Sequence, residues 1–207
     1  MGVSLPNEKH ISQFANIHRG KRIFILASGS SLNKLDLSPL SRRITMGLNR
    51  SVLIYPETHY HCVMDQRLFE LYGDLLKKTR ILFTLAGRPW GVPIDLLGAE
   101  GFSNDLTQGI YSGYTVSYFA LQLAIYMGFK EIFYLGLDLN HMEGKTHFFG
   151  NDFHSKNHEQ TEFPKMIKMF NKASLELKNQ DIQVYNCSME SSLEAFPKMP
   201  YEEAIQL

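Results

Sequence analysis

The segment 141–158 brings several histidines close to carboxylate residues in the sequence. A neutral imidazole titrates near working pH, so one of these histidines could act as a general base. Their spacing matches no zinc pattern and no cysteine joins them, so we expect no metal site here. Several of them are expected to face solvent in a loop. The residues concerned are His141, His147, His154 and His158, together with Asp138, Glu143 and Asp152.

Small and polar residues follow the expected strands, at the place where a parallel sheet binds its ligands. The apolar run 22–27 leads into the turn 28–32, Ser-Gly-Ser-Ser-Leu, in which small residues let backbone N–H groups approach a phosphate. Asn and Asp side chains at neighbouring strand ends can bond a ribose hydroxyl or a base edge. Each residue type is also common in ordinary turns and helix caps. The candidate binding residues at these ends are Gly29, Ser30, Ser31, Asn49, Asp65, Asp138 and Asn140.

A second anion site is expected where a long apolar helix begins. Ser112 and Gly113 precede the apolar run Tyr114–Met127, and Gly128 ends it as a left-handed C-cap. A helix that starts on Ser112 and Gly113 presents unpaired backbone N–H groups, which attract a phosphate. The strand after this helix ends on Asp138, which sets a carboxylate into the wall of the same crevice.

The order of the elements indicates an α/β fold: a single Rossmann-like three-layer α/β/α domain with a mostly parallel sheet. We expect one nucleotide-binding or nucleotide-sugar-binding domain over 1–207, with a His-rich loop at 139–158 and a long irregular connection at 86–109. Short continuous apolar runs are typical of strands buried on both faces. The expected strands are 22–27, 44–48, 59–64, 80–85, 131–137 and 182–185, and the expected helices are 66–77, 112–127 and 161–177.

The composition is that of a globular protein without a dominant charge. Lys+Arg and Asp+Glu both number 21, so the net charge is zero and no overall field recruits nucleic acid. No apolar run is long enough to cross a bilayer, and residues 1–20 do not resemble a signal peptide. Cys62 and Cys187 are expected to be buried free thiols in a reduced compartment. We therefore expect a cytoplasmic protein, with any membrane association peripheral, as at the inner membrane.

Two common nucleotide-binding patterns are missing from the sequence. The P-loop lysine pattern is absent, which argues against a conventional NTPase. The full glycine fingerprint of dinucleotide-binding proteins is absent as well, which argues against a dinucleotide oxidoreductase.

Several motifs resemble those of the bacterial CMP-sialic-acid-dependent sialyltransferases. The stretch from Ser112 to Asp138 is similar to their Thr-Ser-Gly, small-apolar helix and Gly-Tyr-Lys-Glu-Ile-Tyr-Leu-Ser-Gly-Ile-Asp. The turn 28–32 resembles their Asn-Gly-Pro-Ser-Leu, and Asn49 falls where they carry an Asn after the second strand. Residues 154–157, His-Ser-Lys-Asn, match a motif whose histidine acts as general base on the acceptor hydroxyl. The resemblance therefore implies that His154 is the catalytic base, and Lys156 becomes a candidate binding residue.

The chain also resembles a related group of uncharacterised bacterial domains named after hydroxymethylpterin diphosphokinase. Those domains tend to show an Asp after the third strand, a His-Phe-x-Gly motif, and an ending with Tyr-Asn and Leu-x-x-Phe-Pro. The corresponding residues here are Asp65, the segment 147–150, the pair Tyr185 and Asn186, and the segment 193–197. His147 is therefore a further candidate binding residue.

The chain departs from the sialyltransferase pattern in ways that affect phosphate chemistry. The sialyltransferases carry an Arg before Thr-Ser-Gly, whereas residues 109–111 here are Gly-Ile-Tyr. Asn140 stands where they have a tyrosine that helps the leaving CMP phosphate. The segment 138–154 is also much shorter than their lid, so the acceptor pocket is expected to be built differently.

The sialyltransferase resemblance implies an enzyme that transfers a nonulosonic or sialic-acid-type sugar from a CMP-activated donor to a glycan or another hydroxyl acceptor. His154 would take the proton from that hydroxyl, and no cofactor would be required. A homo-oligomer is a further expectation, because the sialyltransferases associate. The aromatic residues Phe148, Phe149 and Phe153 could form an apolar patch for it.

Two other functions remain open. One is an ATP-dependent diphosphokinase-like transferase acting on a pterin or similar alcohol, with Asp65 and Asp138 as ligands of Mg²⁺. The other is a non-catalytic nucleotide-binding module, for which His154 would be dispensable. Stabilisation by CMP without metal favours the sialyltransferase-like function, whereas stabilisation by ATP with magnesium favours the diphosphokinase-like one.

Overall fold

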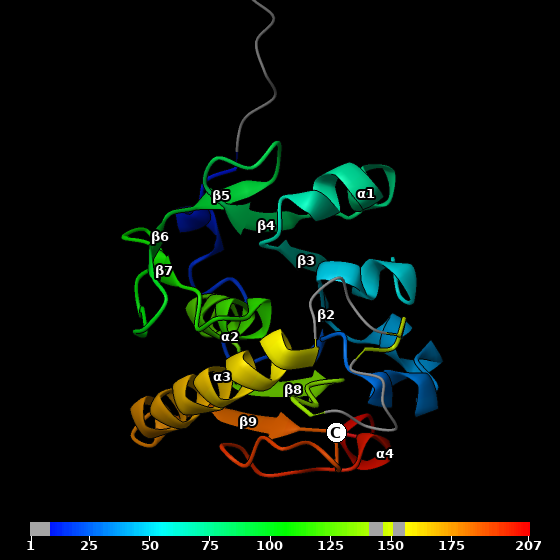
Figure 1. The fold of residues 1–207 in the computed structure, drawn as a ribbon. Coiled ribbons are helices and arrows are strands. Elements are labelled where there is room, and N and C mark those ends of the chain that lie inside the picture. The colour runs from blue at the N-terminus through cyan, green and yellow to red at the C-terminus, as the bar shows by residue number, and fades with distance from the viewer. Residues whose placement is uncertain (1–8, 141–146, 151–155) are drawn as a thin grey trace, which may run out of the picture.

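The computed structural model describes residues 9–140, 147–150 and 156–207, and for 156–160 it describes the backbone alone. One sheet has the strand order β5-β4-β3-β2-β1-β8-β9, and all of its neighbouring pairs are parallel (Figure 1). The predicted α/β fold with a mostly parallel sheet is therefore confirmed. The strands are β1 (Arg22–Leu26), β2 (Thr45–Leu48), β3 (Tyr60–Val63), β4 (Leu82–Leu85), β5 (Val92–Ile94), β8 (Glu131–Leu135) and β9 (Gln183–Asn186).

The central strands are buried on both faces, as their continuous apolar runs predict. In β1, Ile23 and Ile25 pack into one core, and Phe24 and Leu26 pack into the other, because successive side chains alternate across a strand. β1 pairs with β2 on one side and with β8 on the other. The residues that follow Leu26 therefore emerge between two other strands.

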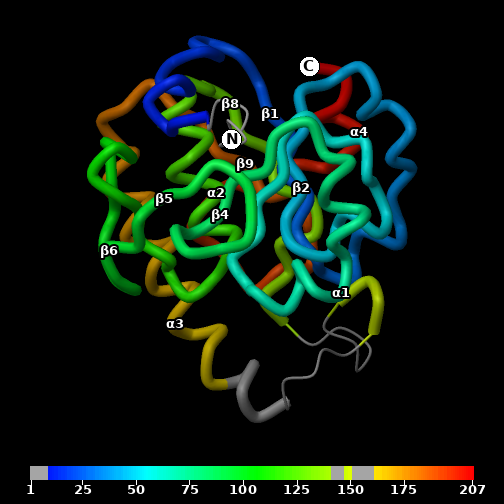
Figure 2. Tube along the Cα trace, turned by 90° about the horizontal axis from the view of Figure 1, so that it is seen from above, coloured from blue at the N-terminus to red at the C-terminus, as the bar shows by residue number. Residues whose placement is uncertain are grey.

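The two faces of the sheet are covered by different kinds of helix (Figures 1 and 2). α2 (Val116–Tyr126) and α3 (Lys156–Leu177) lie on one face, and α3 begins before the expected residue 161. The layers are those predicted, but the other face carries mainly short 3-10 helices. In the connection between β1 and β2, Pro39 and the hydrogen bond from the N–H of Ser38 to the Asp36 side chain separate two of them. The elements on this side are η2 (Ser30–Lys34), η3 (Ser38–Arg42), η4 (Asn49–Leu53), α1 (Arg67–Leu76) and α4 (Tyr201–Ala204).

α2 begins later than predicted. Thr115 is its N-cap, and the hydroxyl of Thr115 accepts a hydrogen bond from the N–H of Ser117. Ser112 and Gly113 precede the helix and donate their backbone N–H groups to the carbonyls of residues 98 and 99. The prediction that the helix starts at Ser112 and Gly113 is therefore wrong, because the backbone of these two residues is still hydrogen-bonded to the segment 98–99.

The segment 86–109 is more regular than predicted. It contains the edge strand β5 and the short strand β6 (Leu96–Gly98), which pairs with β7 (Ile110–Tyr111). The sequence did not predict β5, because Pro93 lies in the middle of this strand. An edge strand tolerates a proline because one of its sides forms no ladder hydrogen bonds.

The order in which strands are added reverses at β1. β2, β3, β4 and β5 follow on one side of it, and β8 and β9 lie on the other side. In an open parallel sheet, ligands bind beyond the carboxyl ends of the two strands at such a reversal. The segments that leave β1 and β8, 27–32 and 136–140, are therefore the ones that this fold brings to a binding position.

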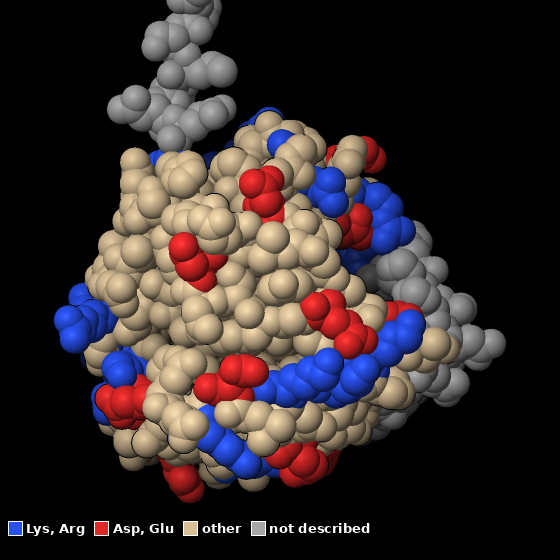
Figure 3. All heavy atoms as spheres, turned by 90° about the vertical axis from the view of Figure 1, so that its left-hand side faces the viewer, with Lys and Arg blue, Asp and Glu red and all other residues tan. Residues whose placement is uncertain are grey.

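The surface carries charges of both signs. Figure 3 shows one face on which acidic and basic side chains are interspersed around a broad uncharged area. Lys168 and Lys172 of α3 both form ion pairs with Glu100, at 3.3 and 3.2 Å. Within the described part of the chain, no helix has the length and apolar character needed to traverse a bilayer.

Both cysteines are buried and unpaired, as predicted. Burial raises the pKa of the Cys187 thiol to about 12. It also raises the pKa of Cys62 well above its usual value. Both thiols therefore stay protonated at neutral pH and act as small apolar side chains.

Candidate functional site

A small cleft opens where β1 and β8 end, and we call it the switch-point cleft. Its volume is about 110 Å³. Strand ends supply its polar wall, and α2 and α3 supply an apolar wall. Gly29, Asp138 and His147, which were predicted from the sequence, are part of the lining. The full lining consists of Ala27, Ser28, Gly29, Leu48, Val116, Ser117, Gly136, Asp138, Leu139, His147, Phe163 and Met166.

Gly29 is required by the close approach of the two strand ends. Its N–H donates to the carbonyl of Gly136 at 2.8 Å. A Cβ at Gly29 would lie 2.4 Å from Cγ of Asp138 and 2.5 Å from that carbonyl oxygen, so a larger residue would push the two segments apart.

Asp138 holds the 28–32 turn in place. It is buried, and its two carboxylate oxygens accept from the N–H of Ser31 at 3.0 Å and from the hydroxyl of Ser31 at 2.6 Å. The same hydroxyl lies 3.1 Å from Oγ of Ser188. A carboxylate that accepts two hydrogen bonds retains further lone pairs. Asp138 therefore organises the turn and can still accept a hydrogen bond from a ligand.

The start of α2 reaches the cleft through residues other than those predicted. Val116 and Ser117, in the first turn of α2, line the cleft. The N–H groups of Ser112 and Gly113 are engaged by main-chain carbonyls, so they are not the unpaired groups that the sequence suggested. Gly113 has a φ of 54°, and a Cβ there would lie 2.2 Å from the ring of Tyr118. The Ser112–Gly113 pair therefore shapes the tight entry into the helix.

The turn 147–150 is hydrogen-bonded to the segment that follows β1. The N–H of Phe148 donates to the carbonyl of Ser28 at 2.9 Å, and Nδ2 of Asn33 donates to the carbonyl of Phe148 at 3.1 Å. His147 and Gly150 also exchange backbone hydrogen bonds, both at 3.0 Å. These bonds fix the turn as one wall of the switch-point cleft.

A stack of side chains links this turn to η4. The ring of His147 lies parallel to that of Phe149, with 4.9 Å between their centroids. The guanidinium carbon of Arg50 lies 4.5 Å from the centroid of Phe149, and Arg50 is buried. The stack therefore brings a positive charge close to the wall that His147 forms.

Asn49 follows Leu48, a lining residue, and has the left-handed φ of 47°. Its carbonyl oxygen lies 2.9 Å from Nε2 of His61. Its side-chain Oδ1 is buried and has no partner within the described residues. Buried amide oxygens normally have a hydrogen-bond partner. Asn49 is not part of the lining, but this unpartnered acceptor directly follows Leu48, which is, and Asn49 therefore stays a candidate binding residue beside the cleft.

Of the predicted binding residues that the structure describes, only Gly29, Asp138 and His147 belong to the lining, and Asp65 and Asn140 are among those outside it. Asp65 accepts from the N–H of Arg67 at 3.0 Å and pairs with its guanidinium at 2.7 Å. These contacts, with the guanidinium hydrogen bond the strongest, hold the pKa of Asp65 below its ordinary value. Asn140 donates from Nδ2 to the carbonyl of Glu190. Both residues thus have structural partners in this conformation.

The predicted catalytic base, His154, lies outside the described residues, as do His141, Glu143, Asp152 and Phe153. Lys156 is the first residue of α3, and its side chain is not described. The roles assigned to His154 and Lys156 therefore stay predictions. Among the residues that are described, no group of His, Cys, Asp and Glu side chains is arranged to hold a metal ion.

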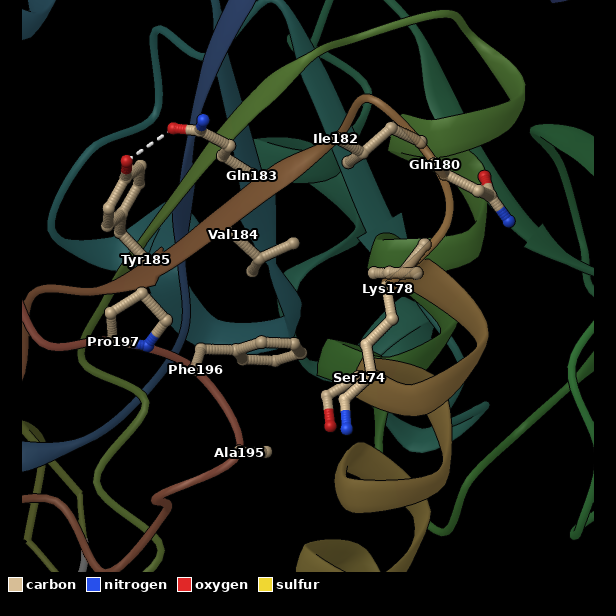
Figure 4. Close-up of a pocket in the computed structure, with 11 residues that line it drawn as sticks. Ser174, Lys178, Gln180, Ile182, Gln183, Val184, Tyr185, Ala195, Phe196 and Pro197 are labelled. Carbon is tan, nitrogen blue, oxygen red and sulfur yellow. Dashed lines mark hydrogen bonds between the residues drawn. The ribbon is translucent and has the colours of Figure 1, made fainter.

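A larger groove lies along β9 at the edge of the sheet, and we call it the β9 groove. Its volume is about 410 Å³. Figure 4 shows Val184 of β9 and Phe196 on one side of it, with Ser174 and Lys178 approaching from the end of α3. No residue predicted to bind substrate lines this groove. Its size alone therefore does not make it the candidate site.

The apolar wall of the switch-point cleft is made of residues that the sequence did not single out. Phe163 and Met166 of α3 both line the cleft and are three residues apart, so they share one face of the helix. The pattern Thr-x-Ser at 115–117 is a helix-start signal that could have located Val116 and Ser117. Nothing local in the sequence could have shown that α3 crosses this edge of the sheet.

Two solved structures are similar to this chain at low sequence identity. The sialyltransferase CstII from Campylobacter jejuni, solved in complex with a substrate analogue, cytidine-5'-monophosphate, is 17% identical over 87% of this chain and 85% of that chain, with a TM-score of 0.53. An alpha-2,3-sialyltransferase from Campylobacter jejuni in apo form is 17% identical over 86% of this chain and 80% of that chain, with a TM-score of 0.43. No family model and no curated protein match the chain. The likeness to CstII shows that the chain shares the α/β fold of a sialyltransferase.

Proposed function

We propose that this protein is a glycosyltransferase-like enzyme that transfers a nonulosonic, sialic-acid-type sugar from a CMP-activated donor to a hydroxyl of a glycan or other acceptor. The observation that carries the proposal is the switch-point cleft, where Gly29, Asp138 and the start of α2 meet. Nucleotides bind at this place in open parallel sheets. The fold likeness to an enzyme solved with cytidine-5'-monophosphate supports the nucleotide class, and the motif resemblance supports the sugar class.

In this proposal, the donor phosphate lies between the 28–32 turn and the first turn of α2. The positive end of the helix dipole at the first turn of α2 favours an anion there. Asn49 and Asp138 accept hydrogen bonds from ribose hydroxyls or from the amino group of the base. The stacked His147 forms a wall beside them.

His154 is the proposed general base. It removes the proton from the acceptor hydroxyl while that oxygen attacks the anomeric carbon of the donor sugar. The bond from this carbon to the phosphate oxygen breaks, and CMP leaves with the electron pair. A correctly placed base contributes about 10²–10⁴-fold in rate. Lys156, from the same motif, is proposed to bind substrate.

The proposal is tested by measuring nucleotide binding and sugar transfer separately. CMP is expected to raise the melting temperature of the wild-type protein without added metal, because a ligand that binds only the folded state stabilises it. His154→Ala is expected to lower transfer by about 10²–10⁴-fold while the CMP-induced shift persists. His158→Ala is the matched control in the same segment and is expected to retain transfer. Full transfer by the His154→Ala variant would remove the assignment of the base.

The same experiment separates the other functions. Stabilisation by ATP with Mg²⁺, but not by CMP, would point to the diphosphokinase-like transferase. The observed contacts do not favour that function, because Asp65, one of the two expected magnesium ligands, pairs with Arg67 and does not line the cleft that Asp138 lines. Nucleotide binding without turnover of any donor would point to a non-catalytic module.

A further inference from the structure

His61 of β3 is a completely buried polar residue that contacts the backbone of a candidate binding residue. Its exposed fraction is 0%, and its Nε2 lies 2.9 Å from the carbonyl oxygen of Asn49. A carbonyl can only accept a hydrogen bond, so Nε2 carries the proton. Burial lowers the pKa of His61 to about 4, although the hydrogen bond to Asn49 opposes this effect. The imidazole is therefore neutral at physiological pH and donates one hydrogen bond, to Asn49.

The backbone of Asn49 needs this support. Its φ of 47° is in the left-handed region, which asparagine adopts more readily than other non-glycine residues but less readily than glycine. The chain makes this bend between β2 and η4, immediately after Leu48 in the cleft lining. A second tie holds the same bend, because the N–H of Leu48 donates to Oγ of Ser51 at 2.7 Å. The two hydrogen bonds together fix the direction in which Asn49 leaves the strand.

The imidazole is also held in place by close packing. A Cβ at Gly47 of β2 would lie 2.4 Å from Nδ1 of His61 and 2.8 Å from Oγ of Ser51. The ring therefore lies directly against the bare backbone of Gly47. Because this contact prevents the ring from moving toward β2, the position of Nε2 is determined by the sheet itself.

We propose that His61 is a positioning residue for nucleotide binding: it acts through the carbonyl of Asn49 and sets the orientation of the Asn49 side chain at the switch-point cleft. The inference rests on the proposed function, because it assigns the Asn49 side chain to the nucleotide. Asn49 Oδ1 is buried without a partner among the described residues, so it is an acceptor that a ligand donor can use. Neither Asn49 nor His61 is part of the cleft lining, but Asn49 directly follows the lining residue Leu48, so Asn49 and not His61 is assigned to the nucleotide.

The rival explanation is that His61 only fills the core. His61→Leu and His61→Gln separate the two explanations. Leu fills the site but has no donor, whereas the side-chain amide of Gln can place an N–H near the position of Nε2. His59→Leu is the matched control, because His59 is half-buried, directly precedes β3 and does not line the cleft.

CMP affinity is measured by calorimetry for the wild-type protein and each variant. His61→Leu is expected to weaken CMP binding about tenfold, which corresponds to one lost well-placed hydrogen bond. His61→Gln is expected to restore affinity to within about threefold of wild type, and His59→Leu is expected to leave it unchanged. Equal losses for the Leu and Gln variants, or no loss for either, would overturn the positioning role.

A double-mutant cycle tests whether His61 acts through Asn49. Asn49→Gly removes the side chain and tolerates the left-handed backbone. In the Asn49→Gly background, His61→Leu is expected to weaken CMP binding by less than about twofold further, because the side chain that it positions is gone. A full additional loss in that background would contradict the inference. Unchanged CMP affinity in Asn49→Gly alone would contradict it as well.

Hydrogen exchange keeps the inference testable independently of the nucleotide. Amide exchange at residues 48–51 is expected to be faster in His61→Leu than in the wild-type protein, and close to wild type in His61→Gln. Failure of the wild-type protein to bind CMP would contradict the proposed function, whereas unchanged exchange in His61→Leu would contradict the tie between His61 and Asn49. The two failures are therefore distinguishable.

Discussion

The switch-point cleft and the β9 groove differ in size and in what lines them. The groove has a volume of about 410 Å³ and the cleft one of about 110 Å³. In the groove, the hydroxyl of Tyr185 bonds to Gln183 on the same strand, and Val184 and Phe196 provide apolar surface (Figure 4). The cleft instead brings together segments that are far apart in the sequence. The larger of the two pockets is therefore not the one that gathers the residues suited to binding a nucleotide.

The difference follows from the topology of the sheet. β9 is an edge strand, so the groove beside it is bordered by few other strand ends. The cleft lies where β1 and β8 end side by side, and polar residues that cannot be buried in strands gather there. A parallel sheet concentrates such residues at its carboxyl edge. Variants in the two regions should therefore affect stability and nucleotide binding to different extents.

Phe196→Ala is expected to have the largest effect on stability, without affecting nucleotide binding. The Phe196 side chain is buried and packs edge-on against Phe170, with 5.8 Å between the centroids. Replacing a buried phenylalanine with alanine costs about 3–5 kcal/mol. Urea denaturation measures the loss, and CMP affinity is expected to stay at the wild-type value. Weaker CMP binding by the folded variant would show that the β9 groove takes part in nucleotide binding.

Gly29→Ala is expected to have a smaller effect on stability and a large effect on CMP binding. The added Cβ would meet the Asp138 carboxylate at 2.4 Å, and overpacking of this kind costs about 1–3 kcal/mol. Gly87→Ala is the control for CMP binding, because a Cβ there meets nothing within 4 Å and the strain that its φ of 81° imposes on alanine lies outside the cleft lining. Denaturation and CMP titration of both variants check this prediction. Equal CMP affinities would place the nucleotide elsewhere.

Ser31→Ala is expected to cost about 1–2 kcal/mol, because it removes a hydroxyl that donates to a buried carboxylate at 2.6 Å. The N–H of Ser31 still reaches Asp138 in this variant, so the turn is expected to remain folded. Ser188→Ala removes only the contact between the Ser188 hydroxyl and the Ser31 hydroxyl, and it is the milder control. A larger loss in Ser188→Ala than in Ser31→Ala would contradict the role assigned to Asp138.

Asp65→Asn is expected to have the smallest effect, below about 1 kcal/mol, because its partner Arg67 is on the surface. The folded-state pKa of Asp65 is lowered, so its contribution is present above the unfolded pKa and is lost as the pH falls through the folded pKa. The stability difference between the wild-type protein and the variant should therefore shrink in the acid range. A difference that grows as the pH falls below 4 would contradict this assignment.

The central strands could be predicted from the sequence because their signals are local. The runs that form β1 and β8 are largely apolar and stop at polar residues, so the predicted bounds of both strands differ from the observed bounds by two residues at most. β5 was missed because Pro93 breaks the local pattern and only the pairing with β4 makes it a strand. The start of α2 was misplaced because the N–H groups of Ser112 and Gly113 find partners at residues 98 and 99, which no local pattern reveals.

The candidate site was predictable in part for the same reason. Gly29, Asp138 and His147 follow strands or belong to motifs, and all three line the switch-point cleft. Asn49 was predicted as a residue type, but its left-handed backbone and its contact with His61 depend on the pairing of β2 with β3. Side chains that meet only through tertiary packing, such as that of Met166, leave no pattern in the sequence.

The most direct test of the account is to record backbone amide chemical shifts of the wild-type protein during a CMP titration. The account predicts that the largest changes occur at residues 28–31, at Val116 and Ser117, and at Asp138. Changes that cluster at residues 183–185 and 195–196 of the β9 groove, or no saturable change at all, would contradict it.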